Sequence, residues 1–435
     1  APELIRSRLV AFESSTLQTI DSSKLIDHTA LSRAAVSVVE RLCDNDYSAF
    51  IVGGAVRDLL LGKRPKDFDV ATNATPEQVV ALFRGSRIIG RRFQIVHVRM
   101  GREIIEVTTF RGHHGDGAPQ TAVKSHKGLL LRDNVYGTLD QDAARRDLTI
   151  NALYLDPVNK LILDDLDGIE DIRQRLVRVI GDPATRYSED PVRMLRVVRF
   201  AAKLGFTIEE ASQASISQCL HLLADIPPAR LFDETLKLFM AGFAAPTIEH
   251  LAKHGLLEPL FPEAIGAMNE PSSRSLILKA MANTDARIAR GKPVTPAFLL
   301  GALLWPAVAA RGRDIASAGA HEGSPINAAS QQVLTITLQR VSIPKRFSIP
   351  MREIWELQPR LEKCSSKRVK SVLSQRRFRA AFDLLLLRSE SSEELKSTVS
   401  FWEEQQQLFP DVVGSLPATE IPQRKRRLRR RKRSQ

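Results

Sequence analysis

The sequence predicts an α/β head, with a mixed sheet and flanking helices, followed by an all-helical neck and body. Short apolar runs rich in β-branched residues, as strands are, lie at 49–53, 86–90, 94–99 and 103–110. After Asp182-Pro183 these signals nearly vanish, and amphipathic helical segments follow at 189–204, 209–224, 228–241 and 246–256. The change of pattern places the sheet in the first part of the chain and helices in the rest.

The 435 residues therefore divide into five expected parts. They are a flexible leader rich in Ser and Thr (1–30), an α/β head (31–181), a helical neck (182–265), a helical body (266–415) and a disordered basic tail (416–435). A chain of this length can bury several cores.

The net charge of +13 is concentrated in the tail. Nine basic residues and no acidic one lie in 424–433, namely Arg424, Lys425, Arg426, Arg427, Arg429, Arg430, Arg431, Lys432 and Arg433. Such a run repels itself and is expected to stay disordered until it meets a polyanion. Nucleic acid is the first candidate partner and an anionic membrane surface the second; a solubilising tail without a partner is the remaining alternative.

The chain shows no sign of export or of membrane insertion. Its three cysteines are far apart in the sequence and suggest neither zinc ligands nor disulfides. The longest apolar run, 296–310, contains Pro306 and is too short to cross a bilayer. The first residues lack the apolar region of a signal peptide. We therefore expect a cytoplasmic protein with no transmembrane segment.

The first motif of the head is a glycine pair, Gly53-Gly54, followed by Arg57 and then by Asp67 and Asp69. Residues i and i+2 of a strand point to the same face, so the two aspartates can present their carboxylates side by side. Two hard oxygen ligands beside a glycine turn suit metal-assisted phosphoryl or nucleotidyl transfer. The alternative is a solvated polar end of a strand.

Between the strands, one helix start and one loop can be predicted. Thr75 is the expected N-cap of a helix, with Pro76 at the first helical position and Gln78 completing a capping box. The glycine-rich segment 111–128 is an expected mobile loop.

Two further blocks carry charged residues amid apolar ones. Glu106 lies among strand formers and would interrupt an apolar face unless it faced a site; an exposed edge position is the alternative. Arg145 and Arg146 can bind triphosphate oxygens bidentately. Asp147 and Asn151, four residues apart, would share one face of a helix, where Asp147 can join the acidic cluster or hold one of the arginines.

The last motif precedes the first long helix. Asp190 before Pro191 suits an N-cap, and Arg193 follows three residues later. An aspartate and an arginine at a helix start can also read the hydrogen-bonding edge of a base. Adenine and cytosine both offer an amino donor and a ring acceptor, so this pair does not separate ATP from CTP.

In this order the blocks resemble the class II nucleotidyltransferases, the family of bacterial poly(A) polymerases and CCA-adding enzymes. The resemblance covers roughly residues 35–260 and rests on Gly53-Gly54 with Arg57-Asp58, Asp67-x-Asp69, Arg145-Arg146-Asp147-x-Thr149-x-Asn151 and Glu189-Asp190-x-x-Arg193. It implies a nucleotidyltransferase head, a nucleotide-recognition neck and an RNA-binding body.

The resemblance also implies roles for individual residues. Asp67 and Asp69 would bind two Mg²⁺ ions, and Asp147 would belong to the active site. Glu106 lies on the strand that carries the third carboxylate, and the choice between Glu106 and Asp147 as third acidic group stays open. The triphosphate would contact Gly53, Gly54 and Arg57, with Arg145 or Arg146 assisting, and the incoming base would contact Asp190 and Arg193. Asn151 would also belong to the nucleotide-binding residues.

Within the family, the sequence is more similar to the poly(A) polymerases. Residues 88–98 resemble a block that marks these enzymes, and residues 226–232 resemble their version of a segment that differs in CCA-adding enzymes. A basic tail favours the same assignment, because an enzyme that acts on many RNA ends benefits from sequence-independent attraction to phosphates.

The expected activity is template-independent addition of AMP from ATP to RNA 3′ ends, on mRNA and other transcripts, with release of pyrophosphate. It would feed RNA processing and decay, with RNA-decay proteins as candidate partners. The enzymatic alternative is CCA addition to tRNA. A third hypothesis, an RNA-binding homologue with an inactive site, conflicts with the intact Asp67, Asp69 and Asp147.

Overall fold

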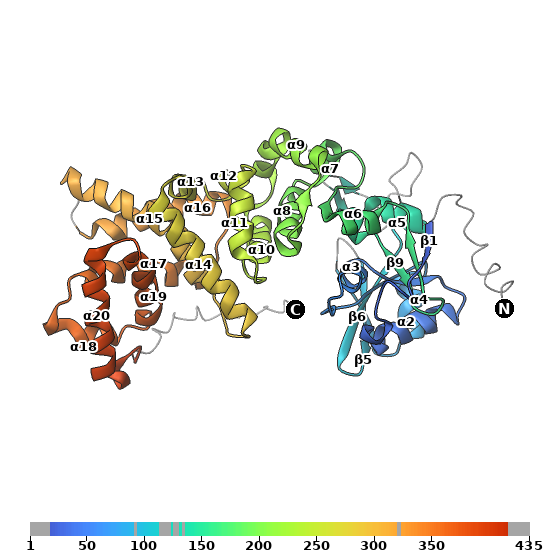
Figure 1. Ribbon diagram of the computed structural model, residues 1–435, viewed down its shortest axis with the longest axis horizontal. Coiled ribbons are helices and arrows are strands. Elements are labelled where there is room, and N and C mark those ends of the chain that lie inside the picture. Colours follow the sequence, from blue (N-terminus) through green and yellow to red (C-terminus); the bar gives the residue numbers. More distant parts are fainter. Residues whose placement is uncertain are drawn as a thin grey trace, which may run out of the picture. The chain divides into compact units, whose positions relative to one another are not determined.

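The computed structural model describes residues 18–90, 94–112, 135–319 and 323–415, together with the backbone of 123–124 and 130–132 (Figure 1). The expected basic tail, the first part of the expected leader and residues 91–93 of the block at 88–98 lie outside the described residues. The chain folds as two units, residues 1–227 with 249–259 and residues 228–248 with 260–435. The five-part division stays a prediction.

A mixed eight-stranded sheet forms the centre of the first unit. Its order is β1-β10-β9-β2-β3-β6-β5-β4. The strands are β1 (Gln18–Asp21), β2 (Ala49–Val52), β3 (Asp69–Thr72), β4 (Ser86–Ile89), β5 (Ile95–Met100), β6 (Glu103–Thr109), β9 (Tyr154–Asp156) and β10 (Leu161–Asp164). β3 and β6 run parallel, and the other neighbours in this sheet run antiparallel.

The helices of the head flank this sheet (Figure 1). They are α2 (Arg33–Cys43), α3 (Gly54–Leu60), α4 (Pro76–Leu82), α5 (Leu139–Arg145) and α6 (Gly168–Gln174), with short 3-10 turns η1 (His28–Ala30) and η2 (Thr149–Asn151). The predicted strands and the mixed sheet with flanking helices are confirmed. The predicted capping box is also present, because Thr75 and Gln78 exchange hydrogen bonds at the start of α4.

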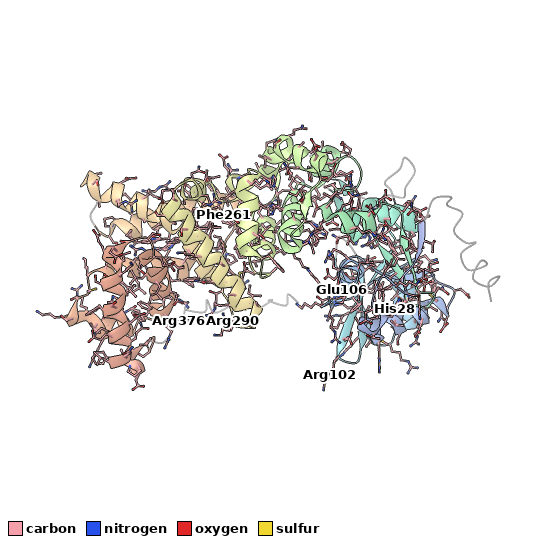
Figure 2. All side chains as sticks on the ribbon, viewed as in Figure 1. His28, Arg102, Glu106, Phe261, Arg290 and Arg376 are labelled. Carbon is pink, nitrogen blue, oxygen red and sulfur yellow. The ribbon has the colours of Figure 1, made fainter. Side chains whose placement is uncertain are left out.

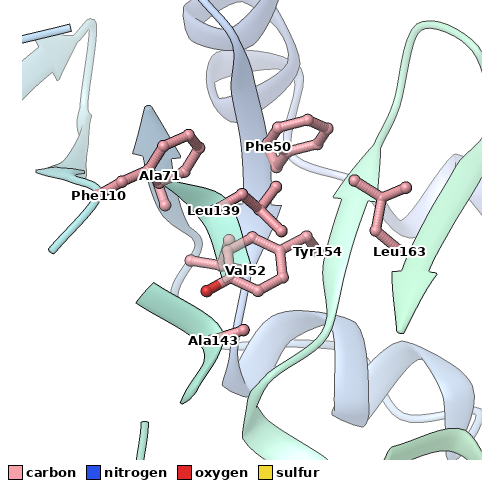
Figure 3. Packing of buried hydrophobic residues seen from close by; sticks show 8 residues of the cluster. All are labelled: Phe50, Val52, Ala71, Phe110, Leu139, Ala143, Tyr154 and Leu163. Atoms are coloured by element: carbon pink, nitrogen blue, oxygen red, sulfur yellow. The ribbon is translucent and has the colours of Figure 1, made fainter. Parts of the chain in front are cut away.

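One face of the sheet carries an apolar core beneath α5 (Figure 3). Phe50 and Val52 point to this face, whereas Ala49 and Ile51 between them point to the other, as the period of a strand requires. The rings of Phe50, Phe110 and Tyr154 lie with centroids 6.2–6.4 Å apart. This packing fixes the ends of β2, β3 and β9, where the polar residues described below begin.

Several predicted boundaries of helices, strands and loops in this unit are wrong. Residues 18–21, expected in a flexible leader, form β1 and pair with β10. Residues 123–124, expected in a loop, form β7 (Val123–Lys124), which pairs with β8 (Leu130–Arg132). The expected helix 189–204 begins at Val192, because Asp190 is extended before Pro191.

A helical segment completes the first unit. It contains α7 (Pro183–Glu189), α8 (Val192–Leu204), α9 (Glu210–Cys219) and η3 (Leu220–Asp225), with the short parallel pair β11 (Leu176–Val177) and β12 (Thr207–Ile208). Gly205 ends α8 in the left-handed conformation, as its position in the sequence predicts. α8 packs against β11, β12 and α7.

The second unit is helical within the described residues, as predicted. Its elements are α10 (Pro228–Phe239), α11 (Ala244–Lys253), α12 (Leu257–Leu260), α13 (Pro262–Asn269), α14 (Pro271–Ala289), α15 (Pro296–Ala318), α16 (Pro325–Arg340), α17 (Lys345–Glu362), η4 (Ser366–Arg368), α18 (Val369–Leu373), α19 (Phe378–Ser389), α20 (Glu393–Leu408) and η5 (Pro410–Val412); parts of α11 and α12 belong to the first unit. Trp355 donates to the Gly301 carbonyl at 2.9 Å and ties α17 to α15. None of the helices in the described ranges is long and apolar enough to cross a membrane.

Candidate active site

A row of charged side chains crosses the sheet next to the apolar core. In the ladder, Asp69 on β3 is the partner of Glu106 on β6, which in turn is the partner of His97 on β5. Asp69 shares its face of β3 with Ala71, a member of the core beneath α5. The row therefore lies on the same face of the sheet as the apolar core and begins where that core ends. Figure 2 labels Glu106 on the head.

Asp67 and Asp69 enter this row from the segment before β3. Asp67 is exposed and precedes the strand, Phe68 is buried, and Asp69 is the first residue of β3. The prediction that both aspartates lie on one strand is therefore wrong for Asp67, although Asp67 is near enough to raise the pKa of Asp69.

The electrostatics of Asp69 indicate a place for a cation. Burial and the nearby carboxylates of Glu106 and Asp67 raise the pKa of Asp69 to about 6, and Arg146 offsets part of this. Like charges close together disfavour ionisation, and a bound cation would reverse that penalty. Oxygen donors of this kind suit Mg²⁺. Within the described part of the chain, however, the carboxylates are not drawn together into a group of three around one point.

Arg146 lies between the apolar core and the carboxylates of Asp67, Asp69 and Glu106, which form the acidic row. Its guanidinium donates to the Tyr154 hydroxyl at 2.9 Å and to Asp142 Oδ2 at 3.0 Å, and it lies 5.0 Å from the centre of the Tyr154 ring. Burial disfavours its charge, but Tyr154 and Asp142 outweigh burial and raise the pKa of Arg146 above its usual value. Arg146 is therefore a fixed positive charge near Asp69.

The glycine turn lies against this arginine. Gly53 adopts φ 70° and ψ −129° as it joins β2 to α3, a conformation that side chains other than glycine rarely adopt. A Cβ at this position would lie 3.4 Å from Arg146 Nη1. Gly53 thus allows β2, α3 and Arg146 to meet at the end of the strand.

Arg57 takes a different position from the one that its motif predicts. It is only 2% exposed, and it donates to Asp58 Oδ1 at 2.6 Å and to Asn151 Oδ1 at 2.5 Å. Its guanidinium also lies 5.1 Å from the centre of the Phe200 ring. Arg57 therefore joins α3 to η2 and α8. Its guanidinium is buried by these contacts and is not exposed for a triphosphate to bind.

Asp147 and Asn151 are neighbours, but not on a helix. α5 ends at Arg145, and the chain turns before η2, where Asn151 Nδ2 donates to Asp147 Oδ1 at 3.2 Å. Arg196 of α8 donates to Asp147 Oδ2 at 2.7 Å. Burial alone would raise the pKa of Asp147, but Arg196 and the hydrogen bonds to Asn151 and the Leu148 amide lower it below its usual value. Asp147 is thus held by α8 rather than directed into the acidic row.

The remaining arginines of the motifs lie where α5 and α7 meet. Arg145 donates to the Gly112 carbonyl, and Arg186 donates to the carbonyls of Arg145 and Arg146 at 2.8 and 2.7 Å. Arg193 donates to Glu189 Oε2 at 3.0 Å and to the Arg186 carbonyl at 2.8 Å. Asp190 closes α7, and its carbonyl accepts from the Arg193 amide. Asp190 and Arg193 are therefore adjacent, at the start of α8.

Sequence reasoning missed the residues that fix these groups. They are Asp142, Tyr154, Arg186, Arg196 and Phe200. A signal was present for Arg196, since Arg193, Arg196, Arg199 and Lys203 recur at helical spacing and are the residues of α8 that are not buried. A local signal was also present for Asp142, which lies four residues before its partner Arg146. Nothing local in the sequence marks Tyr154, the other partner of Arg146.

Comparison with family models matches most of the chain. The model described as the poly A polymerase head domain matches residues 49–178. Residues 205–268 match a probable RNA and SrmB-binding site of polymerase A, and residues 318–435 match the polymerase A arginine-rich C-terminus.

Individual relatives differ in how much of the chain they match. Poly(A) polymerase I of Escherichia coli O6:H1 is 45% identical over 416 residues, covering 93% of this chain and 89% of that protein. The CCA-adding enzyme of Geobacillus stearothermophilus is 37% identical over 222 residues, covering 51% of this chain and 53% of that protein. The crystal structure of the Bacillus stearothermophilus CCA-adding enzyme in complex with CTP has a TM-score of 0.59 and 25% identity, covering 88% of this chain and 83% of that one.

Proposed function

The chain belongs to the class II nucleotidyltransferases, on the side of the bacterial poly(A) polymerases, and we propose how its head performs the reaction of that family. It is a polynucleotide adenylyltransferase that extends RNA 3′ ends without a template. The observation that separates this activity from CCA addition is the share of the chain that each kind of relative matches in sequence. Sequence similarity to poly(A) polymerase I of Escherichia coli O6:H1 spans 93% of the chain, whereas sequence similarity to the CCA-adding enzyme of Geobacillus stearothermophilus spans 51%.

The acidic row is the proposed place of catalysis. Asp67 and Asp69 would hold two magnesium ions, with Glu106 as the third acidic ligand. The contacts favour Glu106 over Asp147, because Glu106 faces Asp69 across the ladder while Asp147 is paired with Arg196. Magnesium, when bound, would lower the pKa of the terminal 3′-hydroxyl and stabilise the charge on the leaving pyrophosphate.

The groups around the row would hold ATP. Gly53 and Gly54 allow the triphosphate to approach the backbone, and Arg146 supplies a fixed positive charge beside Asp69. Arg145 would assist. Arg57 and Asn151 would act indirectly, since their hydrogen bond holds α3 against η2.

The base would be read at the start of α8. There the side chain of Arg193 is held by Glu189 and by the Arg186 carbonyl, beside Asp190. A held guanidinium loses less conformational entropy when it accepts a hydrogen-bonding partner. We propose that Asp190 and Arg193 bind the Watson–Crick edge of adenine, in a cytoplasmic enzyme whose tails mark transcripts for decay proteins.

Substitution of the carboxylates tests the catalytic assignment. Asp67→Ala or Asp69→Ala should reduce AMP transfer by at least a thousandfold while the circular dichroism spectrum and RNA affinity stay close to wild type. Glu106→Gln should also reduce transfer, whereas Glu103→Gln, on the opposite face of the same strand, serves as the control. Near-normal transfer in either aspartate variant would overturn the assignment.

Nucleotide choice is tested by offering each nucleotide separately with a generic RNA. Long tails from ATP are expected. Incorporation of CTP confined to tRNA would favour the CCA-adding alternative. Absence of magnesium-dependent release of pyrophosphate would instead favour an inactive RNA-binding homologue.

A further inference from the structure

His97 extends the acidic row by one strand. In the ladder, Arg87 on β4 is the partner of His97, His97 is the partner of Glu106, and Glu106 is the partner of Asp69. Directly opposite residues of neighbouring strands have Cβ atoms about 5 Å apart and share a face. His97 is therefore next to the proposed third carboxylate, on the side away from Asp69.

The contact between His97 and Glu106 fixes the roles of the ring nitrogens. His97 Nε2 lies 3.2 Å from Glu106 Oε1. An ionised carboxylate only accepts hydrogen bonds, so Nε2 must carry the proton and donate it. The second nitrogen, Nδ1, is buried and has no hydrogen-bond partner among the described residues. Among the described residues, the His97 ring is therefore held by its hydrogen bond to Glu106.

The two side chains differ in their freedom. His97 is 20% exposed and packed within the sheet, whereas Glu106 is 48% exposed. A glutamate side chain left free in solvent loses conformational entropy when it is fixed in one rotamer. A donor on the neighbouring strand limits that freedom before a ligand arrives.

We infer that His97 is a positioning residue, which holds Oε1 of Glu106 and leaves the other carboxylate oxygen for a cation shared with Asp69. The inference rests on the proposed function, because it takes Glu106 as a metal ligand. Hydrogen-bonding partners of metal ligands orient them in this way, and their loss costs about 10- to 100-fold in metal affinity. The hydrogen bond between His97 and Glu106 requires neither nucleotide nor RNA. Its effect on metal affinity should therefore be measurable in the free enzyme.

The test measures Mn²⁺ binding to the full chain without nucleotide, from the electron paramagnetic resonance signal of free Mn²⁺. His97→Phe keeps a planar ring and removes the donor, so it should weaken Mn²⁺ binding about tenfold. His97→Gln, which keeps an amide donor, should restore most of the affinity. The control is His28→Phe, since His28 follows β1 at the other edge of the sheet and its ring forms a hydrogen bond with the Ser22 hydroxyl (Figure 2).

A double variant separates this inference from the proposed function. Glu106→Gln should itself weaken Mn²⁺ binding, and His97→Phe added to Glu106→Gln should cause no further loss. If Glu106→Gln binds Mn²⁺ as the wild type does, the metal role of Glu106 fails and the inference falls with it. If Glu106→Gln weakens binding but His97→Phe does not, the inference is wrong and the proposed function stands. Equal weakening by His97→Phe and His28→Phe would also overturn it.

Discussion

Gly53 shows how one residue sets the geometry of the site. Its φ of 70° and ψ of −129° turn the chain from β2 into α3, and its missing side chain leaves room for Arg146 Nη1. Residues other than glycine in such a conformation cost about 1–3 kcal/mol. The backbone of this turn and the charge of Arg146 are therefore placed together.

We expect Gly53→Ala to lower the free energy of unfolding by about 1–3 kcal/mol and to reduce AMP transfer more than its loss of stability explains. The reason is that alanine is strained at this φ, and relief of the strain would shift a turn that lies in contact with Arg146, the fixed charge beside Asp69. Urea unfolding and initial rates at saturating ATP measure the two effects. Gly62→Ala is the control, because Gly62 also has positive φ (67°) but its Cβ would meet nothing within 4 Å. Equal loss of transfer in both variants would refute the contact with Arg146.

At the level of elements, α8 is joined to the turn before η2, and its start carries Arg193, the residue proposed to read the base. Arg196 on α8 pairs with Asp147, and Phe200, one turn further, lies against the guanidinium of Arg57. These contacts join α8 to α3 and η2 within one unit of the fold. Asp147 is thus a link between the segment after α5 and the helix that carries Arg193.

Arg196→Met should therefore destabilise the protein by about 1–3 kcal/mol, because it leaves the buried Asp147 carboxylate without its cation. Adding Asp147→Asn should recover part of the loss, since a neutral amide does not need that partner. The free energies of unfolding of the wild type, the two single variants and the double variant measure the coupling. Strictly additive losses would show that the two side chains act independently.

The histidines of α11 and its end predict a pH dependence of stability. His250 and His254 stack with centroids 5.9 Å apart. Burial and the charge of Lys253 lower the pKa of His250; burial, His250 and Lys253 lower that of His254. At these two positions the unfolded chain then binds protons more readily than the folded one, so their contribution to stability falls as pH drops below about 6.5.

Thermal unfolding between pH 7.5 and 5.5 checks this expectation. The two histidines should lower the melting temperature of the wild type, as pH falls, relative to that of His250→Gln with His254→Gln. Asp69, whose pKa is raised to about 6, acts in the opposite direction in both proteins, so the difference between their slopes is the quantity to compare. His28→Gln, outside α11, is the control for the loss of a histidine. An unchanged slope in the double variant would assign the pH dependence to other groups.

The elements that the sequence predicts well are those with local causes. The strands at 49–52 and 103–109 and the capping box of Thr75 depend on composition and on residues three apart. The turn at 147–151 was missed because the partner of Asp147, Arg196, is 49 residues further along the chain. The break at Asp190 was predictable, since the residue before a proline disfavours the helical conformation.

At the level of the whole molecule, the sequence predicts which carboxylates matter, but not how they are supported. Asp67, Asp69 and Glu106 stand out as acidic residues among strand formers, and the structure brings Asp69 and Glu106 into register. The sequence leaves Glu106 and Asp147 as alternatives for the third group, and the pairing of Asp147 with Arg196 is the observation on which our preference for Glu106 rests. His97 lies in the block 88–98 that the sequence analysis singles out, but its role next to Glu106 had no signal there, because that role depends on the pairing of β5 with β6.

The basic tail gives the last prediction, which concerns the whole chain acting on long RNA. Residues 424–433 carry nine positive charges, and the region is part of the segment that matches the polymerase A arginine-rich C-terminus. Each phosphate of single-stranded RNA that is neutralised adds about 0.7 to the slope of log affinity against log salt. Deleting residues 424–435 should therefore weaken RNA binding at low salt and flatten that slope.

Transfer of one AMP at saturating RNA should change little in this variant, because the acidic row of the head is untouched. Replacing the nine basic residues by glutamine at constant length should have the same effect as the deletion, whereas shuffling their order should have none, since the attraction depends on charge and not on sequence. Fluorescence anisotropy with labelled RNA over a range of potassium chloride concentrations gives the slopes. If the deletion leaves the slope unchanged, phosphate contacts lie elsewhere in the chain, and the tail serves solubility or another partner.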